Sequence, residues 1–530
     1  MELKNYIKIK RALLSVTDKT NLLSLAKCLS ELGCELISTG GTAKVLSEAG
    51  IKYTEIGTVT GNPEAFGGRM KTISFAIESA LLFDREKDKE EAERLGISPI
   101  DLVVCNLYDF EKYVRAGSGL SELIEHIDVG GPTMIRAGAK NFKYVAVVTD
   151  PKDYAGIIEE LTTNEGALSY NTKQRLMTKA FNLTADYDAA IAQAMDKFSG
   201  EDSLRIALKG GKPLRYGENS HQQATMYRRS SSEHSLYDVS SYNGIELSYN
   251  NILDMQAAIE TVVTLNRQGC VIVKHNNPCG MAESNSQLNS LELAWAGDTV
   301  SAFGGIVAFN TLVDLPTARF FEYDNEDKSK KKFIELITAP AFTDEALQYL
   351  KLQKNLRIVT YLPEMLSASN ELRVTNDMAL LQSTDNKLSS KMELATKNEF
   401  PLEEWESLIS FGLAAVRHIK SNAIALVRAT GDGVLQLIGM GSGQPNRLDS
   451  IGLAIKKAKK NLNVSSFENE QIVLISDAFF PFEDNVDAAN EVGIKTLVQP
   501  GGSIRDKYVI ERANSYGMNM ILTGIRHFKH

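Results

Sequence analysis

The stretch RALLSVTDKTNLLSLAKCLSELGCELISTGGTAKVLSEAG, residues 11–50, decides the fold. The apolar run Arg11–Val16 is typical of a buried strand, and leucines and alanines then recur at helical spacing until Gly33. A second short strand, Glu35–Ser38, is followed by another helix that opens at Thr39. Strand, helix, strand and helix at this spacing form a βαβ unit, so we expect an α/β fold with a parallel sheet covered by helices.

The same alternation continues along the chain and predicts two large domains. Asp101–Val104 and Tyr144–Thr149 are further buried strands of the first sheet. Residues 196–213 are polar and rich in glycine, so we place the domain boundary there, with domains at 1–199 and 200–530. Six strand candidates follow in the second domain: CVIVKH, GIVAFN, IALVRA, QIVLIS, KTLVQP and NMILTG. Residues 362–400 have weak periodicity and are interpreted as connecting structure.

The composition argues against nucleic-acid-binding, membrane and secreted proteins. The chain has 530 residues and a net charge of -9, which argues against a nucleic-acid-binding surface. No apolar run approaches the ~20 residues that span a bilayer, so we expect no membrane partner. The first sixteen residues lack the apolar core of a signal peptide, and the five cysteines form no CxxC pair. These features indicate a cytoplasmic protein with reduced thiols.

Several polar segments of the first domain lie at or near strand ends, where open α/β sheets bind ligands. The turns at residues 15–20 and 38–42 open helices, whose free N–H groups bind phosphate. Residues 67–72, GGRMKT, add two cations and a hydroxyl. A set of four side chains, which includes the lysine of this segment, could move protons: Lys71, Tyr108, Asp128 and Lys140.

In the second domain, an apolar strand ends with Lys274 and His275, and we expect a turn at Pro278-Cys279 after it. A Pro-Cys pair after a histidine suggests a zinc deaminase, which requires Pro-Cys-x-x-Cys. Pro278-Cys279 is followed by Gly-Met-Ala, so the second cysteine is missing and we expect no metal. Without a metal, His275 can act as a general base and Lys274 can stabilise developing negative charge. The aromatic run Phe479–Phe482, set between acids, suits a flat heteroaromatic ligand.

Many motifs occur in an order that resembles one enzyme family. They include LSVTDKT, STGGT, GGRMKT, IDVGGPTMIRAGAKN, LRYGENSHQ, VIVKHNNPCG, SNAIAL, GMGSGQPNR, SDAFFPFEDNVD and TGIRHFKH. The chain is therefore similar to the bifunctional AICAR formyltransferase/IMP cyclohydrolase family, which catalyses the last two steps of IMP synthesis. The resemblance covers nearly the whole chain. It implies a methylglyoxal-synthase-like N-terminal domain, and a C-terminal domain of duplicated cytidine-deaminase-like folds without zinc.

The resemblance also implies ligands and residue roles in the second domain. The substrates would be AICAR, its formylated product FAICAR and the cosubstrate 10-formyltetrahydrofolate, and the transformylase sites would form in a homodimer. His275 would take a proton from AICAR, Lys274 would stabilise charge, and Asn422 would orient the formyl oxygen or His275. The implied AICAR contacts are Arg215, Tyr216, Gly304, Glu335, Arg447, Arg526 and Phe528. Phe479 and Asp484 would lie on the folate side.

In the first domain, the resemblance implies a ring-closing set and a nucleotide site. The ring-closing residues would be Lys71, Tyr108, Asp128 and Lys140. The nucleotide-binding positions would be Thr17, Lys19, Ser38, Thr39, Gly41, Thr42, Arg69, Thr72, Asn106, Gly130 and Gly131. One segment departs from the family, which usually follows its Lys-Thr with Leu-His-Pro and a later His-Gly-Gly. Here Lys71-Thr72 is followed by ISFAIES, and Asp109 replaces the proline expected after Asn-Leu-Tyr.

Four other interpretations remain open at this point. The chain could be a formyltransferase whose N-terminal domain is a degenerate nucleotide-binding domain. The first domain alone suggests a phosphate-eliminating lyase like methylglyoxal synthase, against which the 330-residue second part argues. The Pro-Cys pair suggests a zinc deaminase, which the missing second cysteine argues against. A nucleotide sensor that keeps the pockets without the catalysis is the fourth alternative, and the intact Lys274-His275 pair argues against it for the second domain only. The surviving set around Lys71 favours a working cyclohydrolase with a rebuilt loop.

Overall fold

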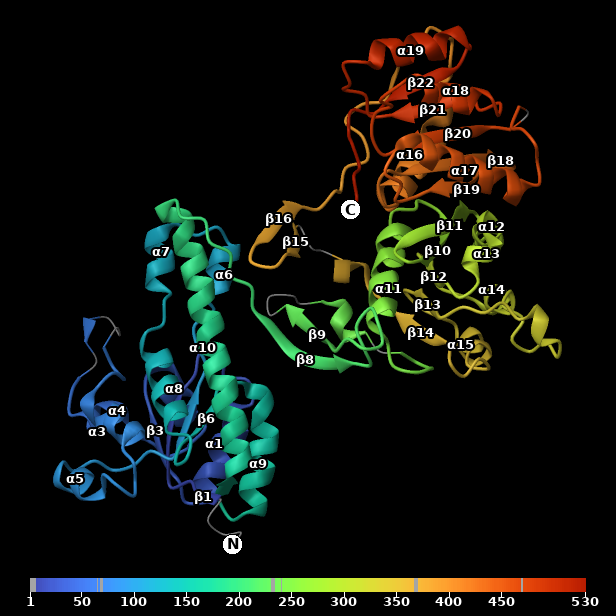
Figure 1. The fold of residues 1–530 in the computed structure, drawn as a ribbon. Helices are drawn as coiled ribbons and strands as arrows, with labels where there is room; N and C mark the ends of the chain where they lie inside the picture. The colour runs from blue at the N-terminus through green and yellow to red at the C-terminus, as the bar shows by residue number, and fades with distance from the viewer. Residues whose placement is uncertain are drawn as a thin grey trace. The chain divides into compact units, whose positions relative to one another are not determined.

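A computed structural model describes residues 6–63, 65–66, 70–229, 234–239, 241–366, 370–468 and 470–530. The chain forms two compact units, Met1–Ala207 and Leu208–His530 (Figure 1). The first unit ends eight residues after the domain boundary expected at residue 199, because the segment that follows the long helix Tyr170–Ser199 (α10) still contacts it.

Unit 1 is built on a five-stranded sheet in the order β4-β3-β2-β5-β6, in which every neighbouring pair is parallel. Its strands are β2 (Arg11–Ser15), β3 (Glu35–Ser38), β4 (Thr54–Glu55), β5 (Leu102–Cys105) and β6 (Ala146–Val148). A two-stranded antiparallel sheet pairs β1 (Tyr6–Lys8) with β7 (Ala167–Ser169). The expected parallel sheet is confirmed, and the predicted strand Glu35–Ser38 has the predicted bounds.

Helices cover both faces of the unit 1 sheet. They are α1 (Leu22–Glu31), α2 (Gly40–Glu48), α3 (Ile56–Thr60), α4 (Phe75–Leu82), α5 (Lys89–Arg94), α8 (Gly130–Lys140), α9 (Tyr154–Thr163) and α10. Two short helices, α6 (Phe110–Arg115) and α7 (Leu120–Glu125), pack instead with α10 in a separate apolar cluster. Successive residues of the strands point to opposite faces, so Leu13 and Val103 join one apolar cluster, whereas Leu14 and Val104 join another. The sheet is therefore buried on both sides, as a parallel sheet requires.

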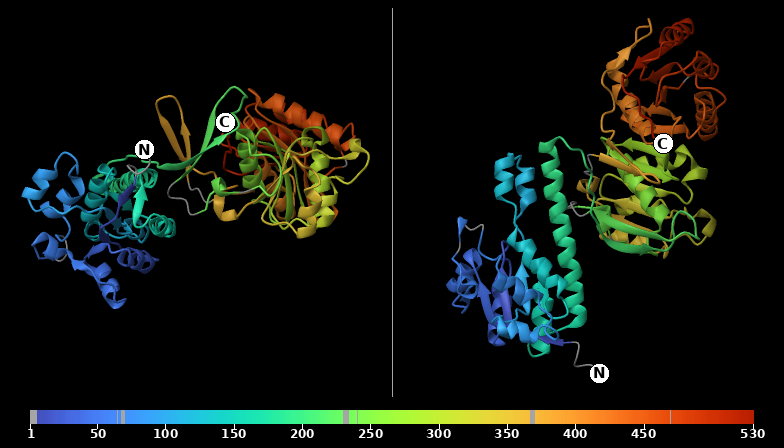
Figure 2. Two further views of the ribbon diagram at one scale, coloured as in Figure 1. Left: turned by 90° about the horizontal axis from the view of Figure 1, so that it is seen from below. Right: turned by 60° about the vertical axis from the view of Figure 1, so that its left-hand side comes forward.

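Unit 2 contains an eleven-stranded sheet in the order β14-β13-β12-β10-β11-β19-β18-β20-β21-β22-β17. The topology occurs twice: a hairpin, an antiparallel neighbour and then parallel strands. In Figure 2 the first half is green to yellow and the second is orange to red. The first half has β10 (Gln268–Lys274), β11 (Asn277–Ser284), β12 (Ile306–Phe309), β13 (Leu336–Ala339) and β14 (Arg357–Thr360). The second has β18 (Ile424–Thr430), β19 (Val434–Gly441), β20 (Ile472–Ser476), β21 (Thr496–Gln499), β22 (Asn519–Leu522) and β17 (Glu393–Leu394).

The helices of unit 2 pack on this sheet, and two separate ribbons accompany it. The helices are α11 (Tyr249–Val262), α12 (Gln287–Gly297), α13 (Thr299–Ala302), α14 (Leu315–Arg319), α15 (Asp344–Leu350), α16 (Leu402–Arg417), α17 (Arg447–Leu462), α18 (Asp484–Asn490) and α19 (Asp506–Ser515). The ribbons pair β8 (Leu208–Leu214) with β9 (Ala224–Arg229), and β15 (Asn370–Val374) with β16 (Ala379–Ser383).

Two expectations for unit 2 are wrong. Residues 362–400 are not only connecting structure, because they contain the β15–β16 ribbon. Pro278 and Cys279 do not form a turn but belong to strand β11. Pro278 fits there because the pairing of β10 with β11 is irregular beside it, and an irregular position tolerates a missing N–H group.

Three further observations concern the described residues. All five cysteines are free. No helix in the described ranges combines the length and apolarity needed to cross a bilayer. Within those same ranges, no three His, Cys, Asp or Glu side chains come together as a metal site would require.

Candidate active sites

The Lys274–His275 pair of unit 2 lies at a tight hairpin. Lys274 is the last residue of β10 and pairs with Asn277, the first residue of β11. His275 and Asn276 are therefore the two residues of the connecting turn, and His275 is not in the strand as the sequence suggested. Their φ angles are 54° and 59°, the left-handed values that a type I′ hairpin turn demands of both residues.

Lys274 extends from the end of β10 toward the segment that precedes β12. Its Nζ donates to the backbone carbonyl of Phe303 at 2.8 Å. A Cβ atom at Gly304 would lie 3.9 Å from the same Nζ, and Gly304 itself has a φ of 76°. The structure thus brings two of the predicted residues, Lys274 and Gly304, side by side.

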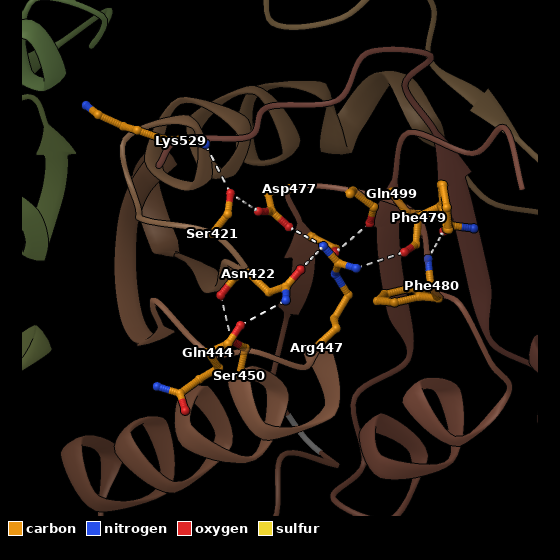
Figure 3. A network of polar contacts seen from close by, with 12 residues as sticks. Ser421, Asn422, Gln444, Arg447, Ser450, Asp477, Phe479, Phe480, Gln499 and Lys529 are labelled. Carbon is orange, nitrogen blue, oxygen red and sulfur yellow. Dashed lines mark hydrogen bonds and ion pairs between the residues drawn. The ribbon is translucent and has the colours of Figure 1, made fainter. Parts of the chain in front are cut away.

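Asn422 lies in a network of hydrogen bonds at the start of β18 (Figure 3). Its Nδ2 donates to the carbonyls of Gln444 at 2.8 Å and Pro445 at 3.1 Å. Its Oδ1 accepts from Arg447 Nη2 at 2.9 Å. Both N–H groups of the Asn422 amide are therefore used, and only acceptor capacity on Oδ1 remains.

Arg447, expected to contact AICAR, has its guanidinium engaged with the protein. Nη2 also donates to Asp477 Oδ1 at 2.7 Å, and Nη1 donates to the carbonyl of Phe479 at 3.1 Å (Figure 3). Both charged side chains are buried. Arg447 thus fixes Asn422 and the backbone of Phe479, whose ring is 36% exposed. The sequence did not indicate Asp477 as a partner.

Asn277 connects the histidine turn to the Asn422 network. Its Nδ2 donates to the carbonyl of His275 at 2.8 Å. Its Oδ1 accepts from the backbone N–H of Lys420 at 3.0 Å and from Ser442 Oγ at 2.7 Å. The sequence analysis missed Asn277. Its one signal was a second amide side chain directly after the turn, in the motif KHNNP.

The C-terminal tail runs beside the same network. Ser421 exchanges two hydrogen bonds with Lys529, and the backbone N–H of His527 donates to the carbonyl of Asp477 at 2.8 Å. Arg526 lies over the ring of Phe528, with 4.4 Å from its Cζ to the ring centroid. The tail is therefore docked against the start of β18 and the end of β20.

The remaining predicted residues of unit 2 are placed by other contacts. Arg215 lies over the ring of Tyr216 at 5.5 Å, directly after β8. Glu335 forms an ion pair of 2.8 Å with the buried side chain of Arg357, which holds its carboxylate toward β14. Asp484 is the first residue of α18 and accepts from Asn485 Nδ2 at 2.7 Å.

In unit 1, three predicted nucleotide turns meet at the carboxyl ends of neighbouring parallel strands. Asn106 Oδ1, directly after β5, accepts from the backbone N–H of Thr17 at 2.6 Å and of Asp18 at 2.9 Å, directly after β2. Thr42 Oγ1 exchanges hydrogen bonds with the backbone of Val16. Thr39, Gly41 and Lys19 lie at the same edge, with Lys19 Nζ 3.7 Å from where a Cβ of Gly41 would be.

Ser38 and Thr42 are buried, and their hydroxyls bond to backbone groups of the neighbouring strand. Ser38 Oγ donates to the carbonyl of Leu14 at 2.9 Å. These two hydroxyls hold the turn before α2 against the end of β2 through hydrogen bonds to its backbone. The backbone N–H groups at the start of α2 suit a phosphate. The ammonium of Lys19 lies beside them and donates to the carbonyls of Val16 at 3.4 Å and Thr17 at 3.2 Å, which holds this positive charge at the turn.

Lys71, Thr72, Asp128, Gly130 and Gly131 form a second cluster at this edge. A Cβ at Gly130 would lie 2.5 Å from Thr72 Oγ1, and one at Gly131 would lie 2.6 Å from Asp128 Oδ2. Burial raises the pKa of Asp128, against the opposing effects of the Gly131 N–H, the Lys71 charge and a backbone hydrogen bond at Tyr108. A carboxyl group with a raised pKa in such a cluster is suited to proton transfer.

Tyr187 of α10 supports this cluster and was not predicted. The backbone N–H of Asp128 donates to Tyr187 Oη at 2.8 Å. Arg69 lies outside the described residues. Lys140 is the last residue of α8, roughly 15 Å along the helix from Gly130, so the structure does not bring it to Asp128.

The segment that follows Lys71-Thr72 is a helix start. Ser74 Oγ accepts from the backbone N–H of Ile77 at 3.2 Å and caps α4. Ile77 and Leu81 are fully buried in the sheet cluster. Glu78 is half-buried, and burial raises the pKa of its carboxyl. The segment is thus an ordered capped helix beside Thr72.

Known protein families match segments of both units of this chain. A family model described as AICARFT/IMPCHase bienzyme matches residues 138–457, and one described as MGS-like domain matches residues 21–133. The chain belongs to the AICARFT/IMPCHase bienzyme family. The predicted resemblance and the methylglyoxal-synthase-like first domain are confirmed.

Curated relatives with one shared name match this chain over their full length. The bifunctional purine biosynthesis protein PurH of Persephonella marina is 41% identical to this chain, and the match covers 98% of this chain and 100% of that protein. PurH of Aquifex aeolicus is 42% identical over 98% of this chain and 100% of its own. A solved structure, the crystal structure of ForH, is 33% identical and covers 35% of this chain and 98% of its own, at a TM-score of 0.32.

Family membership over nearly the whole chain assigns it both activities, AICAR formyl transfer and IMP cyclohydrolase. The full-length match to bifunctional relatives does not favour the alternative in which the first unit is a degenerate nucleotide-binding domain. The formyltransferase activity implies a formyl-folate cosubstrate.

Proposed function

We propose that unit 2 transfers a formyl group from 10-formyltetrahydrofolate to AICAR, and that unit 1 closes FAICAR to IMP. The observation that carries the assignment of unit 2 is the connection between the His275 turn and the Asn422 network. Asn277 bonds to the His275 carbonyl, the backbone N–H of Lys420 and Ser442 Oγ at 2.7–3.0 Å. Lys420 and Ser442 lie two residues before Asn422 and its partner Gln444 in the chain. His275 and Asn422, two residues suited to acyl transfer, thus belong to neighbouring hydrogen-bonded segments.

The formyl transfer follows from the side chains at the turn. The 5-amino nitrogen of AICAR attacks the formyl carbon, and His275 removes the proton that the nitrogen loses. The Lys274 ammonium stabilises the oxyanion of the tetrahedral intermediate. The bond from the formyl carbon to N10 of the folate then breaks as N10 takes up the proton held by His275, which releases neutral tetrahydrofolate and FAICAR. Side chains supply both the base and the oxyanion partner, so the step calls for no metal.

Asn422 is assigned a positioning role in this reaction. Its amide N–H groups already donate to two carbonyls, so it cannot donate to the formyl oxygen without breaking them. Its Oδ1 retains the capacity to accept a further hydrogen bond, which suits an N–H of His275 or of the substrate amine. Arg447 keeps this amide in place.

The predicted contacts divide between the two substrates. Arg215 and Arg526 suit the phosphate of AICAR, because their guanidinium groups are exposed beside an aromatic ring. Tyr216, Gly304, Glu335 and Phe528 complete the AICAR side. Phe479 and Asp484 are assigned to the folate, since the half-exposed ring of Phe479 can stack on a pterin.

Ring closure in unit 1 depends on positioning. The carboxamide nitrogen of FAICAR attacks its formyl carbon, and the resulting hydroxyl leaves as water with a proton from the enzyme. Asp128, Lys71 and Tyr108 are assigned to these proton transfers. Thr17, Lys19, Thr39, Gly41, Arg69, Thr72 and Asn106 are assigned to the nucleotide. Lys140 is not part of the cluster, and Lys140→Ala tests whether it acts at all.

The active form is proposed to be a homodimer in the cytoplasm. Strand β16 is exposed at every residue and β15 at four of its five, and the outer strand β8 is exposed along most of its length. Isolated two-stranded ribbons are marginally stable in water, so a second copy of the chain is the proposed cover. Light scattering after size exclusion tests the dimer. The five free thiols and the net charge of -9 suit a cytoplasmic enzyme without nucleic-acid partners.

One incubation tests the proposed chemistry. The full chain is mixed with AICAR and 10-formyltetrahydrofolate, with and without a chelator, and FAICAR is resolved from IMP. His275→Ala should reduce formyl transfer by about 10²-fold or more, the usual effect of losing a general base. IMP formation from added FAICAR should stay unchanged. Turnover near that of the wild type in His275→Ala would contradict the role of His275.

A further inference from the structure

The turn that carries His275 adopts a conformation that its own residues disfavour. His275 and Asn276 both have positive φ angles, and they are the only adjacent pair of non-glycine residues with that property in the described ranges. A Cβ makes this region unfavourable, least so for His and Asn, and type I′ turns usually contain Asn-Gly instead. Two such residues in succession call for contacts from outside the turn that favour this conformation.

The carboxylate of Asp254 is bonded to both residues of the turn. Oδ2 accepts from the backbone N–H of His275 at 3.3 Å, and Oδ1 accepts from the backbone N–H of Asn276 at 2.7 Å. With its amide nitrogen turned toward α11, the Asn276 side chain also donates to Asp254 Oδ1 at 3.3 Å and to the Leu253 carbonyl at 3.0 Å. Two backbone donors that the hairpin leaves unpaired are thereby satisfied by one side chain.

Asp254 itself is held rigidly. It lies in the second turn of α11, whose start is fixed by a capping box between Ser248 and Asn251. The neighbouring residues Met255 and Ala258 are fully buried in the core cluster. Because α11 packs against β10, the carboxylate has a fixed position relative to the end of that strand.

We propose that Asp254 is a positioning residue for formyl transfer, which holds the His275–Asn276 turn in its left-handed conformation and so aims the His275 imidazole. This inference rests on the proposed role of His275. Asp254 acts through the backbone and does not touch the substrates. A base displaced by about 1 Å can lose about 10²-fold in rate, so the clamp matters for turnover.

The test uses the full-length enzyme and a repair of the turn. Asp254→Ala should lower kcat for formyl transfer by about 10- to 100-fold, with KM for AICAR changed less than about twofold. Asn276→Gly makes the left-handed turn favourable without a clamp. In the Asn276→Gly background, Asp254→Ala should therefore reduce kcat several-fold less than it does alone, as a double-mutant cycle measures.

Two controls separate the possible failures. His275→Ala sets the rate without the base, and an unaffected rate there would overturn the role of His275 itself. Asp314→Ala removes a carboxylate that accepts from the Thr317 N–H at the start of α14, and it should lower Tm without changing kcat.

Three outcomes would overturn the role of Asp254 while leaving that of His275 intact. The first is an unchanged kcat in Asp254→Ala, and the second is a raised KM with unchanged kcat, which would indicate direct binding of AICAR. The third is a loss of kcat that Asn276→Gly does not reduce, because that would indicate a chemical role for the carboxylate.

Discussion

Arg447 Nη2 lies 2.7 Å from Asp477 Oδ1, and the two side chains are only 7% and 0% exposed. Such a pair is desolvated, so its value depends on how completely each charge is bonded. Asp477 also accepts from Ser421 Oγ at 2.7 Å, and Arg447 also bonds to Asn422 and Phe479. The pair thus connects residues assigned to both substrates of formyl transfer.

Removing one partner of this pair should destabilise unit 2 strongly. Asp477→Ala leaves the Arg447 charge buried without a partner, which typically costs about 3–5 kcal/mol. Arg447→Met combined with Asp477→Ala should lose less than the sum of the two single changes. Urea unfolding of the unit 2 transition measures the free energies.

An exposed pair in the same unit gives the control. Arg512 and Asp487 are 42% and 31% exposed and 2.6 Å apart. Their double-mutant cycle should give a coupling of at most about 1 kcal/mol. Equal coupling for the two pairs would mean that burial of the Arg447 pair has no energetic consequence.

The strands of unit 1 could be predicted because their signals are local. Glu35–Ser38 is a short apolar run between polar turns, and its bounds match the structure. Strand β11 was missed because Asn-Asn-Pro-Cys-Gly has the composition of a loop. Only the pairing of Lys274 with Asn277 shows that His275 and Asn276 alone make the turn.

The sequence named candidate site residues but not the contacts between them. The sequence pointed to His275, Asn422 and Arg447, yet it gave no sign that Arg447 bonds to Asp477, which is thirty residues away. The sequence also did not show where Lys140 lies. Its distance from Gly130 follows only from the structure, in which α8 runs unbroken from one residue to the other. Such relationships depend on tertiary packing and not on spacing.

Lys173 should make the stability of unit 1 depend on pH. Its side chain is 2% exposed, and Nζ donates to the Lys143 carbonyl at 2.6 Å. Burial, with a contribution from the Arg85 charge, lowers its pKa from 10.5 to about 8. Between these values the unfolded chain binds more protons, so stability contributed by this group rises with pH.

Lys173→Met tests this directly by removing the titration. From pH 8 to pH 10.5, the free energy of unfolding of the wild type should rise relative to the variant, by at most roughly 3 kcal/mol. Loss of the bond to Lys143 adds a constant offset and no slope. Lys44→Met, on the exposed face of α2, is the matched control. Parallel pH profiles of wild type and Lys173→Met would contradict the prediction.

Unit 1 should fold alone. Residues 1–207 contain its whole sheet and both apolar clusters that cover it. Ending the chain at residue 199 removes the surface ion pair of Arg205 with Asp196, which is worth at most about 1 kcal/mol. Both fragments should therefore show cooperative thermal unfolding by circular dichroism, with similar Tm values. A fragment that ends at residue 180 loses Tyr187 and Ala194 from a third cluster and should be clearly less stable.

The close approach of Gly130 to Thr72 tests whether the rebuilt segment after Lys71-Thr72 serves ring closure. A Cβ at residue 130 would lie 2.5 Å from Thr72 Oγ1, so Gly130→Ala must displace Thr72 or the start of α8. With FAICAR supplied, IMP formation should fall by about tenfold or more, because misplaced groups lose much of their catalytic effect. Formyl transfer by unit 2 should stay at the wild-type rate.

Gly119→Ala is the control for the Gly130 substitution, because Gly119 also lies at the start of a helix, directly before α7, but has open space around its Cβ position. It should leave both activities unchanged. Lys71→Ala should lower IMP formation as well, since the Lys71 charge lies close enough to oppose the raised pKa of Asp128. If Gly130→Ala and Lys71→Ala both close FAICAR at the wild-type rate, the cluster around Asp128 is not the cyclohydrolase site. If the wild type is no faster than buffer, the segment Lys71–Ser79 is a remnant and unit 1 only binds nucleotide.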